Sequence, residues 1–169
     1  KLGYVSQKAV IFNGSINYNV EFGSNGKNKD VKKAIEIAQA KDFVENIDDK
    51  YESNLAQGGT NISGGQKPRI SIARAIAREP EIYIFDDSFS ALDYKTDLNL
   101  RKAIKKNVKD ATCLIVAQRI GTIMHADKII VLDKGKCVGM GTHKELLDNC
   151  EVYKEIALSQ ISKEELDHA

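Results

Sequence analysis

The stretch Ile62-Ser-Gly-Gly-Gln66 restricts the fold of this chain more than any other part of its sequence. Ser63 is a favoured residue for capping the start of a helix, and Gln66, three residues later, completes a capping box. Apolar residues then recur at helical spacing. We therefore expect a helix that begins at Ser63 and ends near Arg78, before Pro80.

Two glycines, Gly64 and Gly65, follow the capping serine, so no Cβ shields the backbone N–H groups there. A helix start with uncovered N–H groups and a positive dipole end suits an anion, most naturally a phosphate. The alternative is an ordinary capped helix, for which two glycines are a poor choice because glycine weakens helices. We therefore expect Ser63, Gly64, Gly65 and Gln66 to bind phosphate.

Expected strands and helices alternate in the second half of the chain, which favours an α/β fold with a parallel sheet. Residues 1–7 indicate the end of a strand that enters a loop. One or two helices are expected over residues 30–47, and a loop over residues 48–62. The later elements are, in order, buried strands at 82–85 and 112–117 with a helix at 94–108 between them, a short helix at 119–126, a hairpin at 128–140 around Lys134-Gly135, and helices at 142–149 and 151–160.

The strand at 82–85 ends in two acids, Asp86 and Asp87. Open α/β sheets place ligand chemistry at the carboxyl ends of their strands. Asp86, the first residue after the strand, suits a Mg²⁺ ion held largely through water, and Asp87 could orient an attacking water as a general base. The alternative is a pair of solvated acids in a turn. The apolar strand and the phosphate-type helix start upstream favour the site.

Composition excludes several classes of protein. The 25 Lys and Arg residues nearly balance the 24 Asp and Glu residues, and no basic stripe indicates nucleic-acid binding. Three cysteines without paired spacing, Cys113, Cys137 and Cys150, favour reduced thiols over a disulfide framework or a zinc site. No apolar run approaches the length of a membrane span.

Together these motifs resemble the nucleotide-binding domain of an ATP-binding cassette (ABC) transporter, from its Q-loop to its C-terminus. The stretch 62–66 resembles the family's signature motif, and the strand ending in Asp86 resembles Walker B. Val5-Ser-Gln7 is similar to the Q-loop, and Ser90-Ala-Leu-Asp93 is similar to the D-loop. The residues that make up these motifs resemble those of exporters, especially bacterial multidrug exporters.

The resemblance implies a partial P-loop NTPase (RecA-like) parallel sheet that lacks its N-terminal half and carries an inserted α-helical subdomain. The implied segments are the strand end and Q-loop at 1–13, the helical subdomain with the signature at 14–78, the C-terminal RecA-like part at 79–160, and a tail at 161–169. The implied ligands are ATP and Mg²⁺. By resemblance, Gln7 and Asp86 belong to the metal site and Asp93 to the nucleotide site.

Two departures from the family pattern concern catalysis. Asp87 stands where the family has glutamate, and the missing methylene withdraws the carboxylate by roughly 1.5 Å, where a misplacement on the order of 1 Å can cost about a hundredfold in rate. Gln118 stands where the family's switch loop has histidine, and an amide cannot shuttle a proton as imidazole does. Asp87 and Gln118 therefore occupy the catalytic positions of a hydrolytically poor site.

No Gly-x-x-x-x-Gly-Lys-Ser/Thr loop, the Walker A motif, occurs in the chain. In the family this loop supplies the backbone cradle and the lysine for the phosphates, and it lies upstream of the Q-loop. We therefore expect the chain to be a piece of a longer protein, and we expect this piece to hydrolyse no ATP by itself.

The pairing of Asp87 with Gln118 resembles the degenerate-site subunit of heterodimeric exporters, whose two nucleotide-binding domains dock head to tail. It implies that the signature completes the ATP site of a second nucleotide-binding domain. It also implies that the Q-loop and the helical subdomain contact a transmembrane domain at the cytoplasmic face of the cell membrane.

Two alternatives stay open: a homodimer with two equal, slow sites, and a non-catalytic module that only completes another subunit's site. Chromosome-maintenance ATPases share the signature helix and the Walker B strand, but they insert long coiled coils. We exclude that class because no heptad array lies between Gln7 and Ile62.

Overall fold

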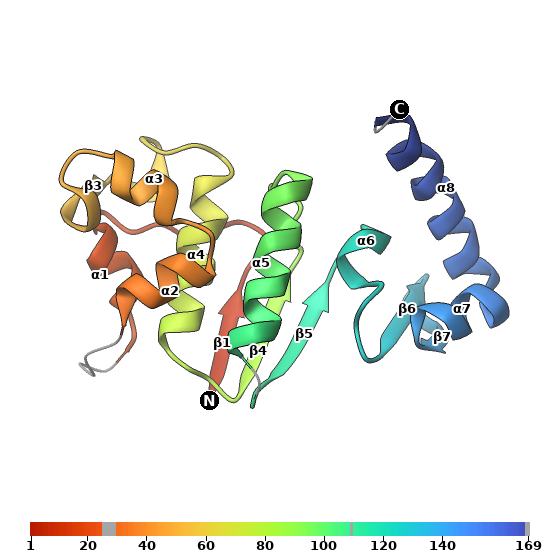
Figure 1. The fold of residues 1–169 in the computed structure, drawn as a ribbon. Coiled ribbons are helices and arrows are strands. Elements are labelled where there is room, and N and C mark those ends of the chain that lie inside the picture. The colour runs from red at the N-terminus through yellow and green to blue at the C-terminus, as the bar shows by residue number, and fades with distance from the viewer. Residues whose placement is uncertain (25–29, 109, 168–169) are drawn as a thin grey trace. The chain divides into compact units, whose positions relative to one another are not determined.

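The computed structural model describes residues 1–24, 30–108 and 110–167. Of residues 161–167 it describes the backbone alone. It divides into two compact units, Lys1–Val116 and Ala117–Ala169 (Figure 1). Each unit is described by itself. No helix in the described part of the chain is long and apolar enough to cross a membrane.

A three-stranded parallel sheet forms the centre of the first unit (Figure 1). Its strands are β1 (Leu2–Val5), β4 (Ile82–Asp86) and β5 (Thr112–Val116), in the order β1-β4-β5. Both neighbouring pairs are parallel. This confirms the predicted α/β fold. It also brings the residues that follow β1 close to those that follow β4, because parallel strands end at the same edge of a sheet.

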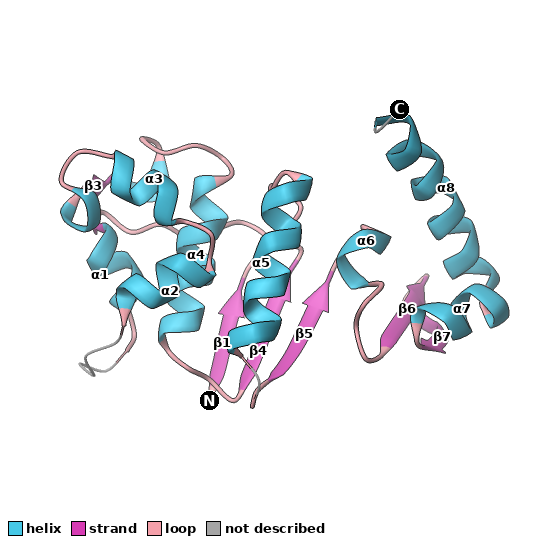
Figure 2. Cartoon of the chain, in the orientation of Figure 1, coloured by secondary structure: helices cyan, strands magenta, loops and turns pink. Residues whose placement is uncertain are grey.

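Helices cover the β1 side of this sheet (Figure 2). Helix α4 packs against β1, and α1 and α2 pack against α4. The helices of this unit are α1 (Ile16–Glu21), α2 (Val31–Ile37), α3 (Lys41–Asn46), α4 (Gln66–Ala77) and α5 (Tyr94–Asn107). The region expected to hold one or two helices holds two, because the backbone at Gln39 turns left-handed between α2 and α3, with φ 56°.

Two expected boundaries differ in detail. The loop expected at 48–62 contains two short 3₁₀ turns, η1 (Lys50–Glu52) and η2 (Gln57–Gly59), and the strand β3 (Asn54–Leu55), which pairs with β2 (Gly14–Ser15). The helix expected from Ser63 begins as α4 at Gln66, because residues 63–65 form the turn that leads into it.

The expectation that β5 is buried is wrong. Leu114 and Val116 are about half exposed, at 51% and 50%. Among the described residues β5 pairs only with β4, so it forms an edge of that sheet. The buried core of this unit lies elsewhere: Phe85 of β4, Leu100 of α5 and Ile70 of α4 belong to one cluster of fully buried side chains.

The second unit is a hairpin with helices. It contains α6 (Ile120–Ile123), β6 (Ile129–Asp133), β7 (Lys136–Gly141), α7 (His143–Asn149) and α8 (Glu151–Asp167). Lys134 and Gly135 both have positive φ, at 47° and 74°, which is the backbone of a two-residue hairpin turn. The predicted hairpin is therefore confirmed.

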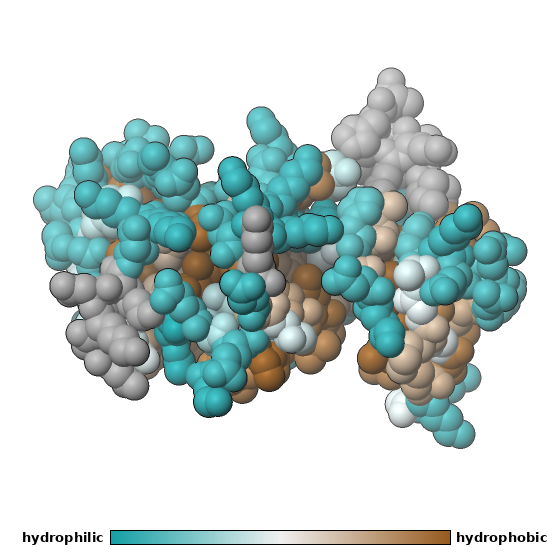
Figure 3. Space-filling view, turned by 60° about the horizontal axis from the view of Figure 1, so that its bottom comes forward, coloured by the Kyte–Doolittle hydropathy of each residue, from teal (hydrophilic) through white to brown (hydrophobic). Residues whose placement is uncertain are grey.

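The inner face of this hairpin packs on the helices, since Ile129 and Val131 share a buried cluster with Tyr153 and Ala157. Its outer face carries apolar side chains, and Ile130, Leu132 and Met140 are each more than half exposed. Apolar surface on this unit is visible in Figure 3. Helix α8 continues to Asp167, past its expected end at 160, and residues 168–169 of the expected tail lie outside the described residues.

Candidate functional site

The signature turn, residues 63–66, forms the predicted capping box. The Gln66 N–H donates to Ser63 Oγ at 3.3 Å, and the Ser63 N–H donates to Gln66 Oε1 at 2.8 Å. The Gln66 N–H also reaches the Ser63 carbonyl, at 3.1 Å. These reciprocal bonds hold the chain in one conformation at the start of α4, a helix of 12 residues.

The two glycines of the signature turn leave its outer surface open. Ser63 and Gly64 are exposed, and a Cβ built on Gly64 would meet no atom within 4 Å. A Cβ on Gly65 would lie 3.6 Å from the backbone oxygen of Ala91, so the D-loop lies beside the signature turn. A phosphate approaching Gly64 would therefore find backbone, with no side chain of this chain in the way.

The two acids after β4 each receive a hydrogen bond from the segment that ends β1. The Tyr4 hydroxyl donates to Asp86 Oδ2 at 2.9 Å, and Gln7 Nε2 donates to Asp87 Oδ2 at 3.1 Å. The bond to Asp86 raises the pKa of Tyr4, because a phenol loses its proton less readily beside a carboxylate. The structure thus brings together three predicted site residues, Gln7, Asp86 and Asp87.

Asp87 lies at a sharp turn in the backbone. Its φ is 46°, in the left-handed region where Asp and Asn are better tolerated than most residues. Its N–H donates to the Val116 carbonyl at 2.9 Å, and its carbonyl accepts the Ser90 hydroxyl at 2.7 Å. This turn lifts the Asp87 carboxylate off the line of β4 and toward Gln7.

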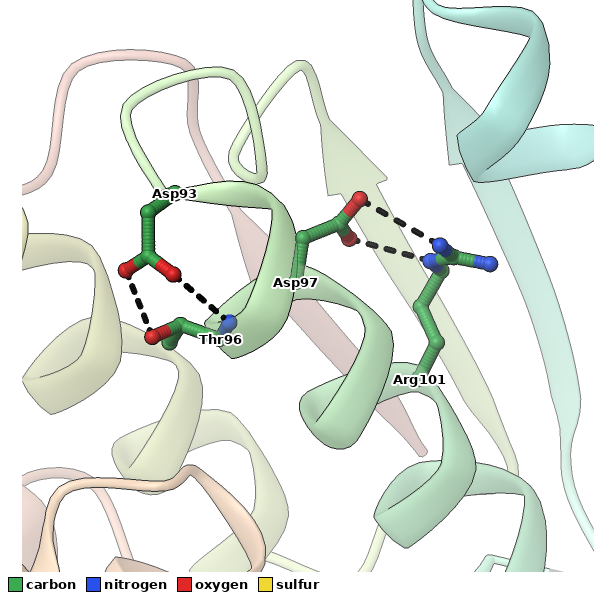
Figure 4. Close-up of polar contacts among 4 residues, drawn as sticks. All are labelled: Asp93, Thr96, Asp97 and Arg101. Atoms are coloured by element: carbon green, nitrogen blue, oxygen red, sulfur yellow. Dashed lines mark hydrogen bonds and ion pairs between the residues drawn. The ribbon is translucent and has the colours of Figure 1, made fainter. Parts of the chain in front are cut away.

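Asp93 caps helix α5 (Figure 4). Its Oδ1 accepts the Thr96 N–H at 2.9 Å, and its Oδ2 accepts the Thr96 hydroxyl at 2.6 Å. These bonds lower the pKa of Asp93, because they stabilise the charged form. On the next turn Asp97, itself buried, pairs with Arg101 at 3.0 Å. Both Asp93 oxygens are thus engaged within α5, and its assignment to the nucleotide site stays a prediction.

Gln118 lies in the second unit and is described only there. Its carbonyl accepts the side-chain N–H of Gln160 at 2.8 Å, and Gln160 Oε1 accepts the Ile120 N–H at 2.7 Å. The side chain of Gln160 thus ties the switch loop to α8. The catalytic assignment of Gln118 stays a prediction.

Sequence reasoning missed Tyr4, although the strand register points to it. Tyr4 is opposite Ile84 in the parallel pair of β1 and β4. Asp86 is two residues beyond Ile84, and residues two apart on a strand share a face. A parallel alignment of the two segments would therefore have placed the phenol beside the acid.

Arg74 was missed as well. It lies on the signature helix, and its guanidinium donates to the carbonyls of Asn19 (2.7 Å) and Val10 (2.8 Å) and to Asn19 Oδ1 (3.0 Å). It also lies over the Phe12 ring, 4.7 Å from the centroid. Burial lowers its pKa to about 10. Arg74 thereby joins the signature helix to the segment that follows Gln7.

The residues present fit Mg²⁺ only in part. No group of three or more His, Cys, Asp and Glu residues that could hold a metal occurs in the described ranges. Mg²⁺, however, is usually bound by one or two carboxylates together with water and phosphate oxygens. Asp86 and the Gln7 amide oxygen are ligands of the right type, and Tyr4 is a partner of the kind that orients such a ligand.

Comparison with known proteins agrees with this geometry. A family model described as ABC transporter matches residues 1–90. An uncharacterized ABC transporter ATP-binding protein of Mycobacterium tuberculosis is 42% identical over 163 residues, which cover 94% of this chain and 28% of that protein. The ABC transporter ATP-binding protein YfiB of Bacillus subtilis is 41% identical over 165 residues, which cover 97% of this chain and 28% of the relative.

The fold gives the same result. A bacterial Atm1-family ABC exporter, solved with ATP bound, superposes with a TM-score of 0.90 at 34% identity, over 94% of this chain and 28% of the exporter chain. The present chain thus spans little more than a quarter of the length of these relatives. With its parallel sheet, its signature turn and these matches, the chain belongs to the ABC transporter family.

Proposed function

We propose that this chain is part of the nucleotide-binding domain of an exporter, a domain that binds ATP with Mg²⁺ and couples head-to-tail dimerisation to transport. The observation that carries the proposal is the pairing of an open, capped helix start at 63–66 with two acids at the carboxyl end of β4. A phosphate-binding helix start and a metal-binding acid are the parts that phosphoryl-transfer sites need.

The site that contains Asp87 is proposed to hydrolyse ATP poorly. Its carboxylate is one methylene shorter than that of the family's glutamate, and it accepts a hydrogen bond from Gln7. A general base must reach the water it activates, and a retracted carboxylate that is already held by an amide is less well placed to do so. Gln118 adds to this, because a neutral amide cannot take up and release a proton as imidazole does.

The signature turn, by contrast, is proposed to serve the ATP site of a second nucleotide-binding domain. Gly64 is open to solvent and its backbone is unobstructed, which suits a γ-phosphate presented by another chain. If this chain docks head to tail with a second domain, its signature turn lies in one ATP site and its Asp87 lies in the other. The site that contains the signature turn would then be competent and the site that contains Asp87 would be degenerate, as in a heterodimer.

The segment after Gln7 is proposed to contact a transmembrane domain. Val10, Tyr18 and Phe22 are between 43% and 49% exposed, and the rings of Tyr18 and Phe22 meet edge to face with centroids 5.9 Å apart. Exposed aromatic surface of this kind is typical of a protein contact. The domain would accordingly lie at the cytoplasmic face of the cell membrane.

Two substitutions in the full-length transporter, co-expressed with its partner, test the proposal. Gly64→Asp adds a negative charge where the phosphate would sit, and we expect it to abolish ATP turnover. Asp87→Asn, a change without a volume penalty, should leave most of the turnover intact because that site contributes little. If Asp87→Asn abolishes turnover as completely as Gly64→Asp does, the two sites are equal and the degenerate-site proposal is wrong.

Restoring the family residues gives a second, independent readout. Asp87→Glu together with Gln118→His should raise turnover at the weak site if those residues limit it. The alternative function, a non-catalytic module, predicts no turnover by the full-length protein without its partner, whatever stands at residues 87 and 118. The 169-residue chain alone is expected to be inactive, because it contains no Walker A loop.

A further inference from the structure

We propose that Tyr4 is a positioning residue for Asp86: its phenol holds the carboxylate in the orientation that binds the divalent cation accompanying the nucleotide. The inference rests on the proposed nucleotide-binding function, since the cation is expected to arrive with ATP. It concerns a residue outside the motifs that identify the family.

The contact follows from the register of the sheet. Tyr4 on β1 is opposite Ile84 on β4, and Asp86 shares a face with Ile84. The Tyr4 side chain therefore extends along the sheet toward the carboxyl end of β4, where its hydroxyl reaches Asp86 Oδ2 at 2.9 Å. Since two hydrogen-bonded strands fix both ends of the contact, the phenol is held in place by the fold.

Among the described residues, the contact does little for packing. Tyr4 is 55% exposed, and it does not belong to the buried cluster of the first unit. An exposed tyrosine whose ring contributes little burial but whose hydroxyl meets an acid is better explained by the acid than by the core. The Asp86 carboxylate is therefore the part of the molecule that depends on Tyr4.

The division of the carboxylate oxygens suits metal binding. Tyr4 occupies Oδ2, and no described residue forms a hydrogen bond with Oδ1. Mg²⁺ demands near-ideal octahedral geometry, so a carboxylate fixed through one oxygen presents the other at a defined angle. Partners of this kind typically change metal affinity by 10- to 100-fold when they are removed.

The neighbouring acid is held in the same way. Gln7, three residues after Tyr4, donates to Asp87 Oδ2. One segment thus supplies a hydrogen-bond donor to each of two adjacent carboxylates. Each acid therefore has its own donor: the Tyr4 phenol fixes Asp86, and the Gln7 amide restrains Asp87.

Metal binding without turnover tests the proposal. The full-length transporter in detergent, saturated with the non-hydrolysable nucleotide AMP-PNP, is titrated with Mn²⁺, and free Mn²⁺ is measured by electron paramagnetic resonance. We expect Tyr4→Phe, which deletes only the hydroxyl, to raise the dissociation constant of Mn²⁺ about tenfold. A dissociation constant within twofold of the wild-type value would overturn the inference.

Matched variants separate positioning from a general effect. Tyr51→Phe also deletes one phenol hydroxyl from the first unit, at a position remote in sequence from the acids, and should leave Mn²⁺ binding unchanged. Asp86→Asn should abolish Mn²⁺ binding at this site, and adding Tyr4→Phe to it should change nothing further. If Tyr4→Phe weakens the Mn²⁺ binding that remains at the partner's site in the Asp86→Asn background, Tyr4 acts elsewhere and the inference is wrong.

The proposed function can fail separately from this inference. If the wild-type transporter binds no Mn²⁺ with the nucleotide, the nucleotide-binding function itself is wrong. If the wild-type protein binds Mn²⁺ and Tyr4→Phe binds it equally well, only the role of Tyr4 is refuted.

Discussion

Arg74→Ala should be the most informative single substitution for the stability of the first unit. Its guanidinium donates three hydrogen bonds, to Val10 and to two oxygens of Asn19, and it lies over the Phe12 ring. Asn19 is itself fully buried. Its Oδ1 accepts the Phe12 N–H and its Nδ2 donates to the Phe12 carbonyl, each at 2.9 Å. Losing Arg74 removes a donor from the Asn19 carbonyl and leaves the Val10 carbonyl with only the longer bond from the Ser71 hydroxyl, at 3.4 Å.

The size of the effect follows from two opposing contributions. Hydrogen bonds from a charged donor contribute about 2 kcal/mol each, so the three bonds contribute about 6 kcal/mol. Burial opposes them: the fall in the pKa of Arg74 from 12.5 to about 10 corresponds to about 3 kcal/mol of desolvation. We therefore expect Arg74→Ala to lower the free energy of unfolding by about 3 kcal/mol.

Urea unfolding of the complete nucleotide-binding domain, followed by circular dichroism, measures this loss. Arg74→Lys keeps a charge but not the planar fork, so it should recover only part of the stability. Arg78→Ala, at an exposed arginine near the end of the same helix, is the matched control and should cost less than about 0.5 kcal/mol. If Arg74→Ala costs no more than Arg78→Ala, the three bonds do not stabilise the fold and the reasoning is refuted.

Three further predictions follow from the geometry. Tyr83 is buried, and burial raises its pKa to about 12, so the folded state keeps a proton that the unfolded state loses. Stability should therefore fall between pH 10 and pH 12, and Tyr83→Phe should reduce that loss in alkaline unfolding. Hydrogen bonds from the Thr96 hydroxyl and from backbone N–H groups lower the pKa of Asp93, so the charged form contributes stability above pH 3.8 that is lost as the pH falls. Thr96→Val removes the hydroxyl and keeps the backbone bonds, so it should reduce this acid dependence, measured by thermal unfolding between pH 2 and pH 6. A side chain at Gly139 would meet Cys150 Sγ at 2.7 Å, so Gly139→Ala should destabilise the second unit by about 1–3 kcal/mol, whereas Gly135→Asn at the turn should cost little in the same denaturant titration.

Local signals predicted the parts of the fold that depend on neighbours in sequence. The capping box of Ser63 and Gln66 forms as expected, because both partners lie within one turn of chain. The same holds for the turn at Lys134 and Gly135. The start of α4 was misplaced by three residues, since a capping box defines the turn before a helix as well as the helix itself.

Features that depend on distant segments were harder to predict. The burial of β5 depends on which strands lie beside it, and its apolar sequence alone indicated a buried strand. The contacts of Tyr4 with Asp86 and of Arg74 with Asn19 join residues 82 and 55 positions apart. The spacing of apolar residues along the sequence does not predict contacts between residues so far apart. The acid pair itself was predicted because Asp86 and Asp87 directly follow an apolar strand.

The left-handed backbone at Asp87 limits how this position can change by mutation. With φ at 46°, the turn accepts glycine, asparagine and aspartate at little cost, whereas a longer L-residue is disfavoured by about 1 kcal/mol. A substitution at residue 87 that leaves stability unchanged is therefore most readily one to glycine or to another short polar residue. Extending the carboxylate to glutamate would gain reach toward a water molecule and lose stability in the same step. A variant that recovers catalysis at this site should thus melt at a lower temperature.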